Sequence, residues 1–308
     1  MKVWWIWRWI FAWICDHHLR IVKKLMESKS PMKIEFLNLF PAAARYGEAA
    51  QQTGVDLSAL WNECVIKPYW PRIAEWAPFD MSYMKPSPIR NLVVLPEQIQ
   101  RFMHIDLDTL RNQFQHIAGR LPKDDDDSLL VALCPLDHAN IPVRERQNGV
   151  VGACVFGNIL LNINPLADDF DRWLPYVFAH EYHHSLWGHH WYVQKGGQDL
   201  QGNLLEHLIT EGQADAFACS LFPDLKPSWI FDIEQAYPSL WSEMENVFDS
   251  TDPEVIQRYT FGDESAGLPW CIGYSVGNRL VNRYMSHHPD IPFFDLLCVH
   301  PQDFLLTD

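Results

Sequence analysis

The sequence predicts an α+β fold in which a small sheet packs against one long helix and the C-terminal half is mostly helical. Strand patterns are grouped between about residues 128 and 163, whereas helical spacing of apolar residues prevails from Asp168 to the end. Grouped strands and helices are typical of α+β proteins, because regular alternation would instead predict parallel βαβ units. A chain of 308 residues, 48% apolar and 20% charged, can bury a large core and is not disordered as a whole.

We expect two parts in the chain: a Trp-rich basic extension over residues 1–31 and a single domain over residues 32–308. Five of the 14 Trp residues lie within positions 4–13. The apolar stretch Val3–Cys15 contains Arg8 and is shorter than the roughly 20 residues that span a bilayer. Three interpretations stay open: an extension upstream of the true start, a peripheral membrane anchor, or a helix packed on the domain.

The first part of this domain, residues 32–128, is predicted to be mainly helical. Apolar residues recur at three- and four-residue steps over residues 33–76. The run NLVVLP at 91–96 predicts a short buried strand, and residues 97–121 predict a helix or a pair of helices. The run KDDDDS at 123–128, with its four consecutive Asp residues, predicts a solvated turn.

The second part, residues 129–308, is predicted to hold the principal strands and the remaining helices. The run SLLVALCPLD at 128–137 predicts a strand. Residues 150–156 and 159–163 predict a hairpin around the Gly157-Asn158 turn, because glycine at the first turn position accepts a positive φ angle.

Charge and cysteine usage limit the classes of partner and compartment. Lys and Arg total 24 against 39 Asp and Glu, a net charge of −15, whereas binding a phosphate backbone needs clustered positive charge. We therefore expect no nucleic-acid partner, and membrane association only through residues 1–31. The seven cysteines are scattered singly without a CxxC pair, which favours a reducing, cytoplasmic location over a disulfide framework or a cysteine zinc site.

The residues with the clearest chemistry lie at 180–184, where HEYHH satisfies the HExxH pattern. On a helix, His180 and His184 are four residues apart and project from one face, so their imidazoles can bind the same metal ion. Glu181 lies beside them, in position to take a proton from water that the metal activates. The sequence therefore predicts a catalytic site with Zn²⁺ as its cofactor.

Two residues compete for the role of third zinc ligand. Glu211 lies in a later segment with helical spacing, and Asp215 follows it by one turn. Such a pair can supply one ligand and one carboxylate that accepts the second N–H of a ligating imidazole. His190 stands at the third-histidine position of HExxHxxGxxH, but Trp187 occupies the place of the glycine in that pattern. We favour Glu211 over His190 for this reason.

The segments FAHEYHHSLW and LITEGQADAFA together resemble the gluzincin pattern of zinc metallopeptidases, HExxH followed by ExxxD. More closely, they resemble the bacterial family of YjaZ-type predicted Zn-dependent proteases, whose C-terminal Gly-Tyr-x-x-Gly helix is similar to GLPWCIGYSVGNRLVNRYM. The similarity covers residues 168–285 and, more loosely, the helices and strands from about Trp61, but not the Trp-rich N-terminus. It implies a zincin-like metallopeptidase fold. It also implies the roles of the site residues: His180, His184 and Glu211 as zinc ligands, Glu181 as general base, and Asp215 as the carboxylate that orients a ligand histidine.

The motif and the resemblance predict a zinc-dependent metallopeptidase that hydrolyses a peptide or protein substrate. Tyr274 is the candidate hydrogen-bond donor to the oxyanion that forms in the reaction, and the alternative is that it is a core tyrosine. Arg279 and His287 are weaker candidates for the same donor. The hairpin could offer an edge strand to an extended peptide. Two other functions stay open: a zinc-binding regulatory or binding module without turnover, and a membrane-peripheral protein acting through residues 1–31.

Overall fold

A mixed sheet of four strands, in the order β1-β2-β4-β3, supports one side of the molecule. β1 (Ile34–Asn38), β2 (Leu129–Pro135) and β4 (Asn158–Ile163) are parallel to one another, and β3 (Val150–Val155) pairs antiparallel with β4. Every residue of β2 is buried, because helices cover the sheet on both faces. A strand covered in this way needs a continuous apolar run rather than alternation.

The computed structural model describes residues 32–123 and 128–305 of the chain. The predicted basic extension over residues 1–31 and residues 124–127 of the predicted acidic turn lie outside the described residues.

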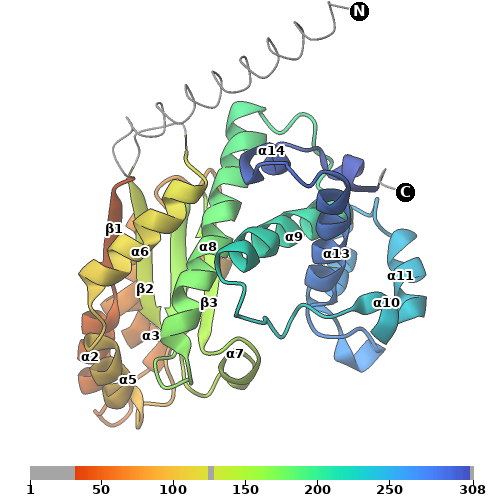
Figure 1. Cartoon of the computed structure of the whole chain (residues 1–308). Coiled ribbons are helices and arrows are strands. Elements are labelled where there is room, and N and C mark those ends of the chain that lie inside the picture. The colour runs from red at the N-terminus through yellow and green to blue at the C-terminus, as the bar shows by residue number, and fades with distance from the viewer. Residues whose placement is uncertain (1–31, 124–127, 306–308) are drawn as a thin grey trace, which may run out of the picture.

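Two layers of helices enclose the sheet (Figure 1). One face packs against α6 (Leu107–Arg120) and α8 (Phe170–Gly188), and the other packs against α2 (Phe40–Ala49), α3 (Leu57–Trp61) and α4 (Lys67–Ile73). Alternate residues of β2 divide between these two cores, as the period of two along a strand requires. The sheet thus holds α8 in a fixed position along its β3–β4 edge.

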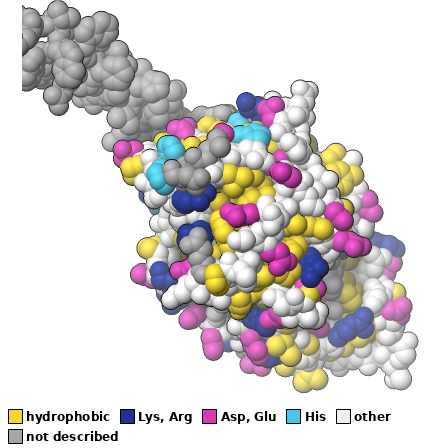
Figure 2. Space-filling model, turned by 90° about the vertical axis from the view of Figure 1, so that its right-hand side faces the viewer, with side chains coloured by type: hydrophobic (Ala, Val, Ile, Leu, Met, Phe, Trp, Pro, Cys, Tyr) yellow, Lys and Arg dark blue, Asp and Glu magenta, His cyan; other side chains and the backbone are white. Residues whose placement is uncertain are grey.

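The C-terminal helices form a further layer on the far side of α8 (Figure 1). α9 (Leu204–Leu221) packs between α8 and α13 (Ile272–His287), and glycines allow α9 and α13 to approach closely. A Cβ atom added at Gly212 would lie 2.2 Å from the backbone carbon of Gly277. The shorter helices around them are α10 (Ile233–Ala236), α11 (Pro238–Glu245), α12 (Pro253–Phe261) and α14 (Phe293–Leu297). Figure 2 views this side of the molecule, where hydrophobic side chains lie among scattered acidic and basic ones.

The structure confirms the predicted α+β class and several of its elements. β2 lies where the apolar run predicted a strand, and α5 (Leu95–Met103) with α6 forms the predicted helix pair. The hairpin also forms, but its turn is Phe156-Gly157 rather than Gly157-Asn158. Both turn residues have positive φ, 47° and 98°, and Asn158 instead pairs with Val155 in the ladder. The Asn158 amide donates to two carbonyl groups at the end of α4, which holds it in the strand.

Two predictions in the first part of the domain were wrong. Residues 33–76 begin with strand β1 rather than a helix. Phe36, Leu39 and Phe40 have the three- and four-residue spacing of a helix, but the backbone of Ile34–Asn38 pairs with β2. Residues 91–96 form a turn and the start of α5 rather than a strand. Val93 is 89% exposed, and Pro96 lies in the first turn of α5, where proline is well tolerated.

Across the described ranges, no helix combines the length and the apolar character needed to cross a membrane. The cysteines described in the structure are free thiols.

Candidate metal centre

The HExxH residues lie in the buried middle of α8. His180 is 7% exposed, and its ring and the ring of His184 face each other across one helical turn with centroids 4.6 Å apart. The Nε2 atoms of the two rings are 3.0 Å apart. The four-residue spacing therefore does what the sequence predicts, since it directs both imidazoles from one face of the helix to one point.

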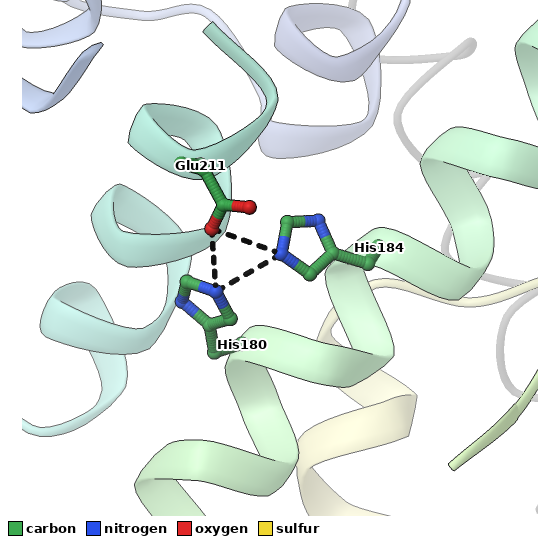
Figure 3. Close-up of side chains that lie close together, drawn as sticks. All are labelled: His180, His184 and Glu211. Atoms are coloured by element: carbon green, nitrogen blue, oxygen red, sulfur yellow. Dashed lines mark hydrogen bonds and ion pairs between the residues drawn. The ribbon is translucent and has the colours of Figure 1, made fainter. Parts of the chain in front are cut away.

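α9 brings a carboxylate to the same point (Figure 3). The Oε2 atom of Glu211 lies 3.1 Å from Nε2 of His180 and 3.3 Å from Nε2 of His184. α9 begins at Asn203, whose side chain accepts from the backbone N–H of Glu206 and caps the helix. Its buried faces pack on α8 and α13, so Glu211 is held by the crossing of two fixed helices.

These three donor atoms fit a single zinc ion. His180, His184 and Glu211 form a group that could hold a metal, and their separations are 3.0–3.3 Å. Ligand atoms about 2.0–2.1 Å from a tetrahedral zinc ion lie roughly 3.3 Å apart, which matches the observed triangle. Two imidazole nitrogens and one carboxylate oxygen are also a donor set that catalytic zinc sites use.

Asp215 contacts His180 at Nδ1, the ring nitrogen that does not face the other two donor atoms. Its side chain is fully buried, and its Oδ1 atom lies 3.1 Å from Nδ1 of His180. The same carboxylate accepts hydrogen bonds from the Tyr176 hydroxyl at 3.0 Å and from the Trp229 indole N–H at 3.1 Å. A carboxylate that accepts from Nδ1 places the proton of His180 on that nitrogen and leaves Nε2 free to bind a metal.

The carboxylates of this cluster attract a cation, either a proton or a metal ion, to its donor atoms. Burial alone would lower the pKa of His180, but the carboxylates of Asp215 and Glu211 outweigh it and raise that pKa well above its usual value. Burial would raise the pKa of Glu211, but the imidazoles of His184 and His180 hold it well below the ordinary range. Glu211 is therefore an anion at neutral pH.

Glu181 lies on the neighbouring face of α8, against the edge strand β3. The side chain is 7% exposed, and burial raises its pKa above the usual value despite the lowering effect of His184 and His180. A Cβ atom added at Gly152 would lie 2.3 Å from the Cγ atom of Glu181, so only glycine permits this approach. The backbone N–H of Cys154 lowers the pKa of Glu181, but the effect of burial is larger. The strand thus fixes the carboxylate beside the histidines.

A cavity adjoins these residues and opens to solvent. The space between its walls, open solvent at the mouth included, is about 430 Å³, and its lining includes His180, Glu181, Gly152 and Tyr274. The Tyr274 ring lies nearly parallel to the ring of His180, with centroids 6.2 Å apart. Burial and neighbouring carboxylates raise the pKa of Tyr274 well above its usual value, so its hydroxyl stays protonated and can act as a donor.

The remaining sequence candidates lie elsewhere. His190 belongs to a π-helical extension of α8, residues His189–Gln194, and its Nδ1 atom lies 3.3 Å from Oε1 of Gln194. Arg279 lies over the ring of Trp241, and His287 is exposed near the end of α13. None of these three side chains lines the described cavity.

Sequence reasoning missed three residues of the site. Tyr176 lies one turn before His180, so its helical spacing was a usable signal. Trp229 reaches Asp215 from an irregular segment, and Gly152 meets Glu181 across two elements. No local pattern identifies the latter two, because their contacts depend on the packing of distant segments.

Comparison with known proteins assigns the sequence to a family. Residues 106–305 match the family described as "Predicted Zn-dependent protease (DUF2268)". The chain belongs to this family. The match confirms the resemblance predicted from the motif segments, over residues 106–305.

The chain is also similar to the uncharacterized protein YjfC of Bacillus subtilis (strain 168), with 31% identity over 157 residues. The alignment covers 44% of this chain and 49% of YjfC, so the chain spans about half the length of that relative. No solved structure gave a significant match.

Proposed function

We propose that this member of the DUF2268 family is a zinc-dependent metallopeptidase. The observation that carries the proposal is the triangle of donor atoms from His180, His184 and Glu211 beside the buried carboxylate of Glu181. Structural zinc sites usually have four protein ligands, whereas the described part of the chain offers a cluster of three. This difference favours a catalytic site over a zinc-binding module without turnover.

In this proposal His180, His184 and Glu211 hold the zinc ion, and Asp215 orients His180. Zinc, when bound, supplies a Lewis acid that lowers the pKa of water and polarises a carbonyl group. Glu181 takes the proton from the attacking water and returns it to the leaving amine. Its raised pKa suits both steps, because a base of higher pKa binds the proton more readily at neutral pH.

Two further groups have roles in the proposed reaction. The Tyr274 hydroxyl, protonated and in the cavity lining, donates to the oxyanion that develops on the substrate. β3 is one of the two edge strands of the described sheet, and an extended peptide adds to it through backbone hydrogen bonds. β3 also contacts Glu181, so a peptide on this edge lies beside the proposed base.

We further propose that residues 32–308 form one catalytic domain with a zincin-like arrangement. Support comes from the edge strand, the HExxH helix and the helix of the third ligand, which pack consecutively as β3, α8 and α9.

The test compares the zinc-loaded wild-type chain with Glu181→Gln on a peptide library. Glu181→Gln should retain zinc and lose hydrolysis by several orders of magnitude, because an amide cannot accept the proton. Glu97→Gln makes the same chemical change on an exposed helix position and is the control. Activity of Glu181→Gln within tenfold of wild type would show that the base is another residue. Zinc binding without wild-type hydrolysis would favour the binding-module alternative.

A further inference from the structure

The cavity beside Glu181 has a mostly apolar and aromatic wall. Tyr176 and Val177 come from α8, Cys271 and Tyr274 from α13, and Trp229 from the segment between α9 and α10. These side chains meet the cavity next to His180 and Glu181, so a group that enters it lies beside the proposed metal site. Pockets that select apolar groups have this composition, with a few polar groups fixing orientation.

The wall is rigid because hydrogen bonds hold its aromatic residues. The Tyr176 hydroxyl and the Trp229 indole N–H both donate to the buried Asp215. The buried hydroxyl of Ser275 donates to the carbonyl of Trp229 and accepts from the N–H of Phe231, which fastens this segment to α13. The two aromatic rings also lie against each other, with centroids 6.0 Å apart. The cavity is therefore preformed.

Charged side chains of a substrate find no partner in this cavity. Its described lining contains neither Lys nor Arg. Arg146, next to the lining residue Gln147, is paired with Glu264 and lies over the ring of Trp270. Apart from His180 of the metal site, the described lining therefore offers an anionic side chain no basic partner, and Glu181 in the same lining carries a like charge.

A cationic side chain of a substrate also lacks a free partner among the carboxylates of the site. The carboxylate of Asp215 already accepts from three donors, and that of Glu211 contacts both histidines. Glu181 is the proposed base and is needed for the proton. Burying an unpaired charge is costly, so Lys and Arg are disfavoured.

We propose that this cavity receives an apolar side chain, aromatic or large aliphatic, of the substrate residue that flanks the scissile bond. The inference rests on the proposed peptidase function and names its substrate class: peptides with Phe-, Tyr- or Leu-like residues at that position. Gln147, an uncharged polar residue of the lining, is the position at which this preference can be changed. Gln147→Glu alters the charge with almost no change of shape.

The test measures binding of amino-acid hydroxamates, which chelate zinc without being cleaved as peptides. N-acetyl hydroxamates of Phe, Leu, Lys and Asp are titrated calorimetrically into the zinc-loaded full chain. We expect the Phe and Leu compounds to bind roughly tenfold or more tightly than the Lys and Asp compounds. Gln147→Glu should reduce the preference for Phe over Lys about tenfold, because it supplies a carboxylate to the cation. Gln52→Glu, an exposed position on the other side of the sheet, should not change it.

Equal affinities for the four compounds would overturn the inference, and so would equal behaviour of Gln147→Glu and Gln52→Glu. Peptide hydrolysis is measured separately on the same preparations. If the apolar hydroxamates bind preferentially while no peptide is cleaved, the cavity assignment stands and the proposed peptidase function fails.

Discussion

Replacing Asp215 by alanine tests whether the buried carboxylate orients a metal ligand. The structure gives Asp215 three donors: Nδ1 of His180 at 3.1 Å, the Tyr176 hydroxyl at 3.0 Å and the Trp229 indole at 3.1 Å. Loss of such a carboxylate behind a zinc-binding histidine typically costs 10–100-fold in metal affinity. That range corresponds to about 1.4–2.7 kcal/mol of binding free energy.

The same substitution should also destabilise the metal-free protein. Asp215 is fully buried, so its removal leaves three buried donors without their acceptor. Each unsatisfied donor costs about 1–3 kcal/mol, which predicts a loss of unfolding free energy on the order of 3 kcal/mol or more. Tyr176→Phe removes one of these donors and keeps the acceptor, so we expect a smaller loss of stability.

The assay is zinc titration against a competing chelator at one pH, together with denaturant unfolding of the metal-free chain. Asp108→Ala is the matched control, because the Asp108 side chain is 85% exposed and lies away from the site on α6. An affinity of Asp215→Ala equal to that of Asp108→Ala would refute the orienting role, whatever its stability.

Three further predictions concern neighbouring residues. Glu211→Ala should lose most zinc affinity while His190→Ala loses little, since only the former removes a donor of the cluster; a chelator titration that ranks them the other way contradicts the ligand assignment. Gly152→Ala should retain zinc but reduce hydrolysis roughly 100-fold, because the added methyl group displaces Glu181. Unchanged steady-state kinetics would show that the contact between Gly152 and Glu181 does not determine the rate of hydrolysis. Zinc affinity should fall as the pH decreases, because protons compete with the metal for His180. Since the pKa of His180 is raised, the fall should begin at a higher pH than for an ordinary histidine. A zinc affinity that stays constant as the pH is lowered to about 6.5 would contradict this prediction.

Local patterns predicted the parts of the site that depend on a single helix. The spacing of His180 and His184 projects both imidazoles from one face whatever surrounds them. The spacing of Glu211 and Asp215 on α9 likewise places both carboxylates towards α8. The continuous apolar run of β2 predicted a strand because it is covered on both faces.

Features that depend on distant segments could not be predicted in this way. β1 exists because Ile34–Asn38 pairs with β2, which follows much later in the chain. Residues 91–96 carry two valines and two leucines, but no strand of the described sheet pairs with them, and Pro96 lies in the first turn of a helix. The contact of Trp229 with Asp215 joins an irregular segment to α9, so neither periodicity nor a motif indicates it.

The metal content of the purified chain tests the central claim most directly. Wild-type protein should bind about one zinc ion per chain, and His180→Ala and His184→Ala should each lose most of it, because each removes one donor of the three-atom cluster. His183→Ala makes the same change at the adjacent buried histidine, which is not part of that cluster, and should keep the metal. Full zinc stoichiometry in both His180→Ala and His184→Ala would contradict the account.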